Sequence, residues 1–170
     1  MYLKNRIWGL RRSMRSERAE YEHERPIEEC GVFGIFTDTG NVANDIFYGL
    51  TALQHRGQES AGMALCDTTG ERGNISFYKG MGLVSEVFKA GKLKDLKGNI
   101  GVGHVRYSTT GGSSIENAQP VVFNYSKGTL ATVHNGNIAK SAELKQELLD
   151  DGTVFRSDTD TEVLALLIAK

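Results

Sequence analysis

Hydrophobic positions after residue 30 follow two alternating patterns. Short runs rich in valine, isoleucine and phenylalanine are typical of strands, and segments with apolar residues every three or four positions are typical of amphipathic helices. Strands are predicted over 31–37, 62–66, 75–78, 100–107, 121–125 and 130–134. Helices are predicted on the apolar faces that begin at Ile46, Leu83, Ala142 and Val163. The pattern predicts one domain in which helices cover strands.

Turn and capping signals separate these elements. Ser126-Lys127-Gly128 predicts a hairpin between the two neighbouring strands, and Gly152 marks the end of the helix from Ala142. Asn44 or Asp45 is expected to cap the helix that contains Ile46. No internal repeat, low-complexity run or interdomain linker interrupts the sequence.

Residues 1–29 have a different composition and are predicted to be a leader. The segment is basic up to Ser16, and acidic residues enter from Glu17 onward. Apolar residues at helical spacing in the basic part leave a membrane-surface or organelle-targeting segment open, but the acidic residues argue against a transit peptide. We expect a disordered propeptide that is removed, with Met14 as a second possible start.

The composition narrows the class of protein. The chain has 170 residues and a net charge of −1, which argues against an obligatory nucleic-acid partner. Two cysteines, Cys30 and Cys66, make neither a disulfide framework nor a four-cysteine metal site, so a reducing cytoplasm is expected. Cys66 is interpreted as a core thiol. No apolar run reaches the roughly 20 residues that span a bilayer, so no membrane partner is expected.

Cys30 is the first candidate for chemistry, because it opens the apolar run 31–36 directly after the charged leader. Cleavage before Cys30 would give one residue both a thiol nucleophile and a free α-amine. An α-amine has a pKa of about 8 and can accept the thiol proton without a histidine. The alternative is a buried structural cysteine at the start of a strand.

Three further segments carry a family resemblance. They read LQHRGQESAG at 53–62, GHVRYSTTG at 103–111 and HNGN at 134–137, and DTDTE follows at 158–162. From about Glu28 to Lys170 the order of these motifs and their residues resemble the amidophosphoribosyltransferase family of glutamine-dependent enzymes. The resemblance implies a class II glutamine amidotransferase domain at 30–170 and a propeptide cut between Glu29 and Cys30.

The same resemblance implies an α+β fold. It is the four-layer α-β-β-α sandwich of hydrolases with an N-terminal nucleophile, in which the cysteine sits at the end of a central strand. The chain stops inside an apparent helix at Lys170, so we expect the domain to be truncated.

Within the resemblance, the chemistry of glutamine assigns three roles to four residues. Asn135 and Gly136 are expected to form the oxyanion hole for the attack by Cys30, Arg106 to bind the α-carboxylate, and Asp160 to bind the α-ammonium. Each has a structural alternative. Asn-Gly is a common hairpin turn, Arg106 would otherwise be a surface arginine at a strand end, and Asp158 or Asp160 would otherwise cap the next helix.

Further residues are placed at the substrate by the resemblance alone. They are Thr109, Arg56, Gly57, His104 and Tyr107, and Arg56 and Gly57 are expected to position the terminal cysteine. His104 and His134 lack a metal-ligand spacing and are interpreted as structural histidines rather than partners in a Cys–His dyad. The small residues 108–114 suit a lid over glutamine better than a phosphate-binding loop.

The resemblance also implies partners that this chain does not itself provide. The parent enzyme is expected to be a homo-oligomeric pentosyltransferase of purine biosynthesis, whose second domain binds phosphoribosyl pyrophosphate with Mg²⁺. No cofactor or metal is expected in this chain, and an iron–sulfur cluster in the parent is left open. Three alternatives remain: another class II glutamine amidotransferase, a self-processing N-terminal-nucleophile peptidase, and a non-catalytic binding or assembly module.

Overall fold

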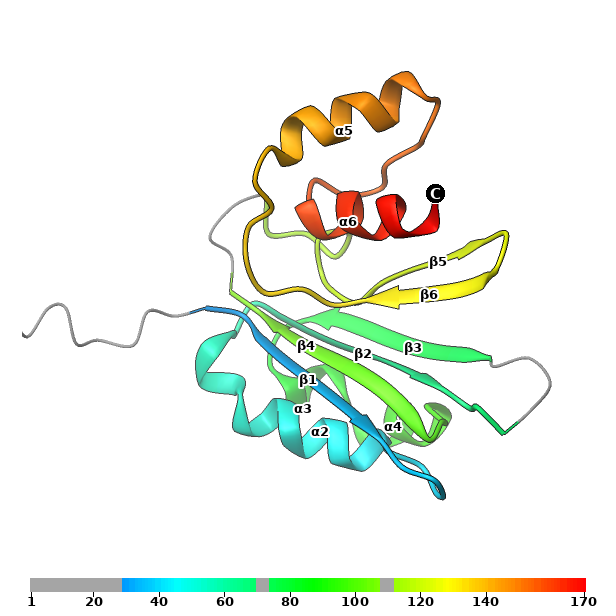
Figure 1. Ribbon diagram of the computed structural model, residues 1–170. Coiled ribbons are helices and arrows are strands. Elements are labelled where there is room, and N and C mark those ends of the chain that lie inside the picture. The colour runs from blue at the N-terminus through cyan, green and yellow to red at the C-terminus, as the bar shows by residue number, and fades with distance from the viewer. Residues whose placement is uncertain (1–28, 70–73, 108–111) are drawn as a thin grey trace, which may run out of the picture.

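Two antiparallel sheets face each other in the computed structural model, which describes residues 29–69, 74–107 and 112–170 (Figure 1). The larger sheet has the strand order β1-β4-β2-β3 and the smaller one is the hairpin β5-β6. The strands are β1 (Gly31–Phe36), β2 (Ser60–Cys66), β3 (Ile75–Met81), β4 (Ile100–Arg106), β5 (Val121–Tyr125) and β6 (Gly128–Thr132).

Helices form the two outer layers (Figure 1). The outer face of the larger sheet is covered by α2 (Ala43–Ala52), α3 (Val84–Val87) and α4 (Ala90–Asp95), and a 3₁₀ turn, η1 (Gln54–Arg56), follows α2. On the far side of the hairpin lie α5 (Ser141–Asp150) and α6 (Asp160–Ala169). The order of layers is helix, sheet, sheet, helix, which confirms the predicted α-β-β-α sandwich and its α+β class.

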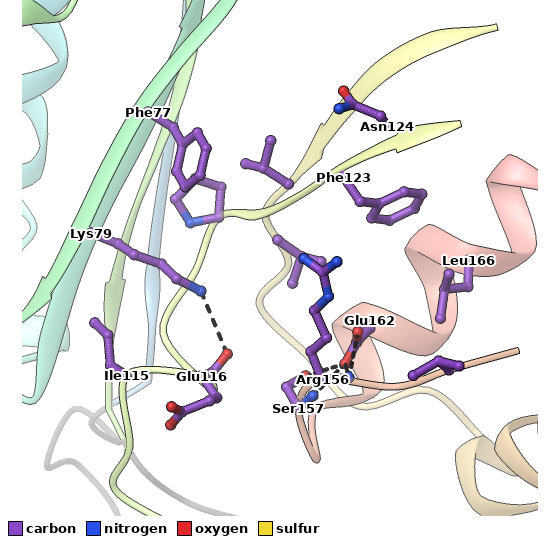
Figure 2. A pocket seen from close by; sticks show the side chains of 14 residues that line it. Phe77, Lys79, Ile115, Glu116, Phe123, Asn124, Arg156, Ser157, Glu162 and Leu166 are labelled. Atoms are coloured by element: carbon purple, nitrogen blue, oxygen red, sulfur yellow. Dashed lines mark hydrogen bonds between the residues drawn. The ribbon is translucent and has the colours of Figure 1, made fainter. Parts of the chain in front are cut away.

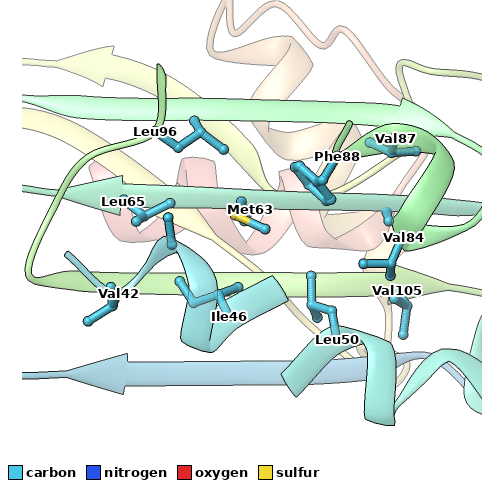
Figure 3. Close-up of a cluster of buried hydrophobic side chains, with 12 residues drawn as sticks. Val42, Ile46, Leu50, Met63, Leu65, Val84, Val87, Phe88, Leu96 and Val105 are labelled. Atoms are coloured by element: carbon cyan, nitrogen blue, oxygen red, sulfur yellow. The ribbon is translucent and has the colours of Figure 1, made fainter. Parts of the chain in front are cut away.

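The main core lies between the larger sheet and α2 and α3 (Figure 3). Ile46 and Leu50, four positions apart on α2, are fully buried against Met63, Leu65 and Val105 of β2 and β4. Burying each such side chain contributes about 1.5–3 kcal/mol, which holds α2 against the sheet. Every residue of β2 except Cys66 is buried, because layers cover both of its faces.

Most predicted elements are confirmed, including the hairpin at Ser126-Lys127 and the end of α5 near Gly152, whose φ is +85°. The helix α4 was not predicted, because its sequence AGKLKD has too few apolar residues to show a helical period. The predicted cap was wrong: α2 begins at Ala43, and Asn41 Oδ1 accepts the Ala43 N–H at 3.3 Å.

Three other expectations are corrected. Among the described strands β1 is an outer strand that pairs with β4, so Cys30 does not precede a central strand. Cys66 is half-buried at the end of β2 and is no core thiol. The strand predicted over 130–134 ends at Thr132, which leaves His134 in the following loop. In the described part of the chain, no helix is long and apolar enough to cross a membrane.

Candidate active site

Cys30 lies directly before β1, beside the end of β4. The antiparallel register pairs Gly31 with Val105 and so brings Cys30 next to the residues that follow Val105. Its Sγ lies 3.4 Å from the backbone N of Tyr107 and 3.5 Å from the backbone O of Tyr107. Tyr107, one of the predicted substrate-binding residues, therefore contacts the cysteine thiol through its backbone.

Two predicted site residues converge on the carbonyl oxygen of Cys30. Asn135 Nδ2 donates to it at 2.9 Å and Arg56 Nε at 3.3 Å. Arg56, the last residue of η1, also places Nη2 3.4 Å from Glu29 Oε2. Arg56 therefore contacts both residues of the Glu29–Cys30 peptide, the bond at which the leader is expected to be cut.

Asn135 and Gly136 occupy the loop between β6 and α5. Gly136 has a φ of +147°, a conformation that side chains with a Cβ rarely adopt. A Cβ at this position would lie 3.2 Å from Nε2 of His134. The turn therefore favours glycine here, and it directs the Asn135 amide toward Cys30.

The backbone of His134, just before Asn135, is held from two sides. Gln119 Oε1 accepts the His134 N–H at 2.7 Å, and Gln119 Nε2 donates to the His134 carbonyl at 3.1 Å. His104 Nε2 lies 3.2 Å from the same carbonyl. Gln119 was not among the predicted site residues, since nothing in local sequence links it to a residue fifteen positions later.

His104, one of the residues that the resemblance placed at the substrate, is fully buried. Burial lowers the pKa of His104 from 6.5 to about 4, and the nearby Arg106 charge adds to this effect, while the bond to the His134 carbonyl opposes it. The imidazole is therefore neutral near pH 7 and donates from Nε2. We assign His104 a role in positioning His134, in line with its interpretation as a structural histidine.

Arg106, the last residue of β4, forms an ion pair with Glu59, and their side chains are 6% and 14% exposed. Arg106 is thus not the surface arginine that the structural alternative required. A buried guanidinium needs an anionic partner, and Glu59 supplies it. Glu59 was missed as a site residue, although it immediately precedes β2, whose register pairs Ser60 with Arg106.

Gly57 lies against the end of β4. A Cβ at Gly57 would approach the carbonyl carbons of Val105 and Arg106 to 2.7 Å, so only glycine fits this contact between backbones. The LQHRGQES motif therefore brings Arg56, Gly57 and Glu59 to the place where β1 begins and β4 ends.

Asp160, the first residue of α6, faces the Asn135 loop. Its Oδ2 accepts the backbone N–H of Ile138 at 2.9 Å, and its Oδ1 lies 3.8 Å from Nδ1 of His134. The other candidate, Asp158, has a side chain that is 82% exposed and lies 3.6 Å from Lys145 Nζ on α5. Of the two aspartates, Asp160 is the one beside the other site residues.

Some predictions fall outside the described residues, namely Thr109, the first part of the expected lid (108–111) and the leader up to residue 28. Within the described ranges, no group of three or more histidine, cysteine, aspartate or glutamate side chains is arranged to hold a metal ion.

A separate cleft of about 480 Å³ lies between β3, β5 and α6 (Figure 2). Phe77 and Lys79 line it from the larger sheet, and Phe123 and Arg156 from the opposite side. Burial in the cleft lowers the pKa of Lys79, while Glu116 and Glu162 oppose the shift. None of the predicted site residues lines this cleft, so it is distinct from the Cys30 site.

Comparisons with known proteins identify the family of this chain. Residues 90–170 match a family described as a glutamine amidotransferase domain. The amidophosphoribosyltransferase of Methanocaldococcus jannaschii is 52% identical over 142 residues, which are 83% of this chain and 29% of the relative. That of Bacillus subtilis is 47% identical over 144 residues, which are 84% of this chain and 29% of the relative.

Solved structures give the same result. The glutamine phosphoribosylpyrophosphate amidotransferase from B. subtilis, complexed with ADP and GMP, has a TM-score of 0.67 and 42% sequence identity. The match covers 82% of this chain and 28% of that one. The chain thus spans about three-tenths of the length of these relatives. It belongs to the amidophosphoribosyltransferase family and covers the N-terminal glutamine amidotransferase part of its members.

Proposed function

We propose that this chain hydrolyses glutamine to glutamate and ammonia through a thioester on Cys30. The observation that carries the proposal is the contact of 2.9 Å between the Asn135 amide and the Cys30 carbonyl, across 105 positions of sequence. A hydrogen-bond donor beside a thiol is what amide hydrolysis requires, because negative charge forms on the amide oxygen as sulfur attacks. Asn135 and the backbone N–H of Gly136 would stabilise that charge.

The reaction requires removal of the leader. The nitrogen of Cys30 is bonded to Glu29 in the chain as encoded, and an amide nitrogen cannot accept the thiol proton. Cleavage between Glu29 and Cys30 would free an α-amine. This amine would accept the proton from Sγ and later return a proton to the departing ammonia.

In this proposal two charged side chains, Arg106 and Asp160, recognise glutamine. Arg106 would bind the α-carboxylate and Asp160 the α-ammonium, while Thr109, Arg56, Gly57 and Tyr107 would complete the site. A binding site for a free amino acid needs such a pair, whereas a peptidase of the same fold binds a substrate without these charges. This favours glutamine over a peptide as the substrate.

The names of the relatives extend the proposal to the whole protein. We infer that the ammonia is used in a further domain, where it converts phosphoribosyl pyrophosphate to 5-phosphoribosylamine with Mg²⁺. That step belongs to purine biosynthesis, and we place the protein in the cytoplasm as a homo-oligomer.

Cys30→Ala in the full-length protein tests the proposal. Glutamate release from glutamine is expected to fall by more than about 1000-fold, because the nucleophile is lost. Synthesis of 5-phosphoribosylamine from added ammonia is expected to persist, since it does not use the thiol. Both rates are measured on one preparation, together with the N-terminal sequence of the active wild-type protein.

Cys66→Ala is the matched control, because it removes the other cysteine at the far end of β2. It is expected to leave glutamine hydrolysis unchanged. Full activity of Cys30→Ala would refute the assignment of the nucleophile, and an active wild-type protein that retains Met1 or Met14 would refute the role of the α-amine.

A further inference from the structure

We propose that residues 112–120, which run from the last part of the expected lid to the start of β5, position both halves of the glutamine site. In this proposal Gln119 fixes the position of Asn135, the expected oxyanion donor. Asn117 fixes the position of the loop that leads to Asp160. The proposal rests on the glutaminase function proposed above. Gln119 and Asn117 are positioning residues, and neither is expected to contact glutamine.

Gln119 acts on Asn135 through the backbone of His134. Its side-chain amide uses both polar atoms on one residue, accepting the His134 N–H at 2.7 Å and donating to the His134 carbonyl at 3.1 Å. The residue is 6% exposed, so water does not compete freely for these bonds. This two-point contact fixes the direction in which the chain enters Asn135.

Asn117 acts on the second half of the site in the same way. It is 3% exposed, and its Oδ1 accepts the backbone N–H of Asp158 at 3.0 Å. Its Nδ2 donates to the carbonyl of Gly112 at 2.9 Å, which closes the loop on itself. Asp158 lies two positions before Asp160, so Asn117 fixes the start of the turn from which Asp160 projects.

The segment can position other residues because it is itself held against the larger sheet. Lys79 Nζ on β3 donates to the carbonyls of Ala118 at 2.5 Å and Glu116 at 3.5 Å, and Figure 2 shows Lys79 reaching toward Glu116. At Gly62 of β2, a Cβ would lie 2.1 Å from the Gln119 carbonyl oxygen. The missing side chain at Gly62 therefore lets the backbone of Gln119 rest directly on the sheet.

The loop before α6 is fixed from its other side as well. The carboxylate of Glu162 accepts the N–H of Arg156 at 2.9 Å and the N–H of Ser157 at 2.7 Å. Asn117 adds the contact at Asp158, the next residue along the chain. The loop is thus held by its own helix at Arg156 and Ser157 and by the 112–120 segment at Asp158.

The two halves of the site enter the kinetics differently. Oxyanion stabilisation acts only in the transition state, so loss of the Gln119 contact should lower kcat and leave KM nearly constant. Ammonium binding acts already on bound glutamine, so loss of the Asn117 contact should raise KM. A general loss of structure would not separate the two constants in this way.

The test uses side chains of similar size that cannot form the hydrogen bonds, in the full-length protein. Gln119→Met is expected to lower the kcat for glutamine hydrolysis by roughly 10- to 100-fold, with KM within about twofold of the wild type. Asn117→Leu is expected to raise KM roughly 10-fold, with kcat within about twofold.

Two conservative variants serve as controls and as substitutes if the first pair does not fold. Gln119→Glu retains an oxygen that accepts from His134, and Asn117→Asp retains one that accepts from Asp158. Gln119→Glu is expected to recover at least half of the change in log kcat caused by Gln119→Met. Asn117→Asp is expected to recover at least half of the change in log KM caused by Asn117→Leu. Equal changes of kcat and KM in both variant pairs would overturn the proposal.

Amide hydrogen exchange separates failure of this proposal from failure of the glutaminase function. Exchange at His134 should quicken by at least about tenfold in Gln119→Met, and exchange at Asp158 by a similar factor in Asn117→Leu. If the wild-type protein does not hydrolyse glutamine, the proposed function fails and exchange alone decides the positioning roles. Unchanged exchange at both amides would overturn these roles, whatever the activity.

Discussion

Asn135 reaches the cysteine with its side-chain amide, and the nature of that contact can be tested separately from the nucleophile. In Asn135→Ala, glutamine turnover is expected to fall by about 100- to 1000-fold, the usual effect of losing one oxyanion donor. Alkylation of Cys30 by iodoacetamide should change much less, because that reaction forms no carbonyl oxyanion. Turnover and peptide-resolved labelling are measured on the same folded protein.

Asn124→Ala, an exposed asparagine of the hairpin, is the control and should change neither rate. A parallel collapse of turnover and labelling in Asn135→Ala would instead make Asn135 a structural turn residue, as the frequency of Asn-Gly in hairpins would suggest.

The buried imidazole of His104 makes stability depend on pH. Its pKa is about 4 in the folded protein and 6.5 in the unfolded chain, so the unfolded state binds more protons between these values. The stabilisation is fully present above about pH 6.5 and is lost as the pH falls toward 4. We expect His104→Gln, which can still donate to the His134 carbonyl, to remove up to about 3 kcal/mol of this dependence.

Thermal unfolding of the wild type and of His104→Gln, followed from about pH 7 to pH 4, measures the difference. The two curves should lie close together near pH 7 and separate as the pH falls, because only the wild type loses stability through His104. Parallel curves would show that His104 does not titrate in this window and would contradict the assigned neutral state.

At the scale of elements, the contact between β2 and the 112–120 segment depends on Gly62. Gly62→Ala places a Cβ 2.1 Å from a backbone oxygen, so the two segments must separate. We expect about 1–3 kcal/mol of lost stability, together with lower glutamine turnover, because Gln119 moves with the segment. Chemical denaturation and turnover are measured in parallel.

Gly34→Ala in β1 is the matched control, since a Cβ there meets its neighbours at an ordinary 3.9 Å. It also replaces a strand glycine by alanine, yet it should leave turnover intact. If Gly62→Ala behaved like Gly34→Ala, the close packing of Gln119 on β2 would have no role in the activity.

Elements with a strong local pattern could be predicted from sequence, and the others could not. The hairpin and α6 follow from runs of apolar residues bounded by turn signals, so their predicted positions agree with the structure within about three residues. By contrast, α4 has almost no apolar face, and the start of α2 depends on Asn41, outside the expected cap. The outer position of β1 is set by pairing between distant strands, which periodicity does not encode.

At the scale of the whole molecule, the site residues also fall into those that sequence could predict and those that it could not. Cys30, Asn135 and Asp160 were named because their motifs resemble a family, and the fold brings these distant segments together. Glu59, Gln119 and Asn117 were missed because they act on other residues across the sheets. Their partners are far away in sequence, so only the three-dimensional structure identifies them.

The large sequence distance between Cys30 and Asp160 has a consequence for synthesis on the ribosome. About 130 residues separate them, and translation at about 5–20 residues per second needs roughly 7 to 26 s to cover that stretch. During this interval the nascent chain carries its thiol without the aspartate expected to bind the α-ammonium of glutamine. Glutamine hydrolysis on the ribosome is therefore delayed until both sheets and the start of α6 have emerged.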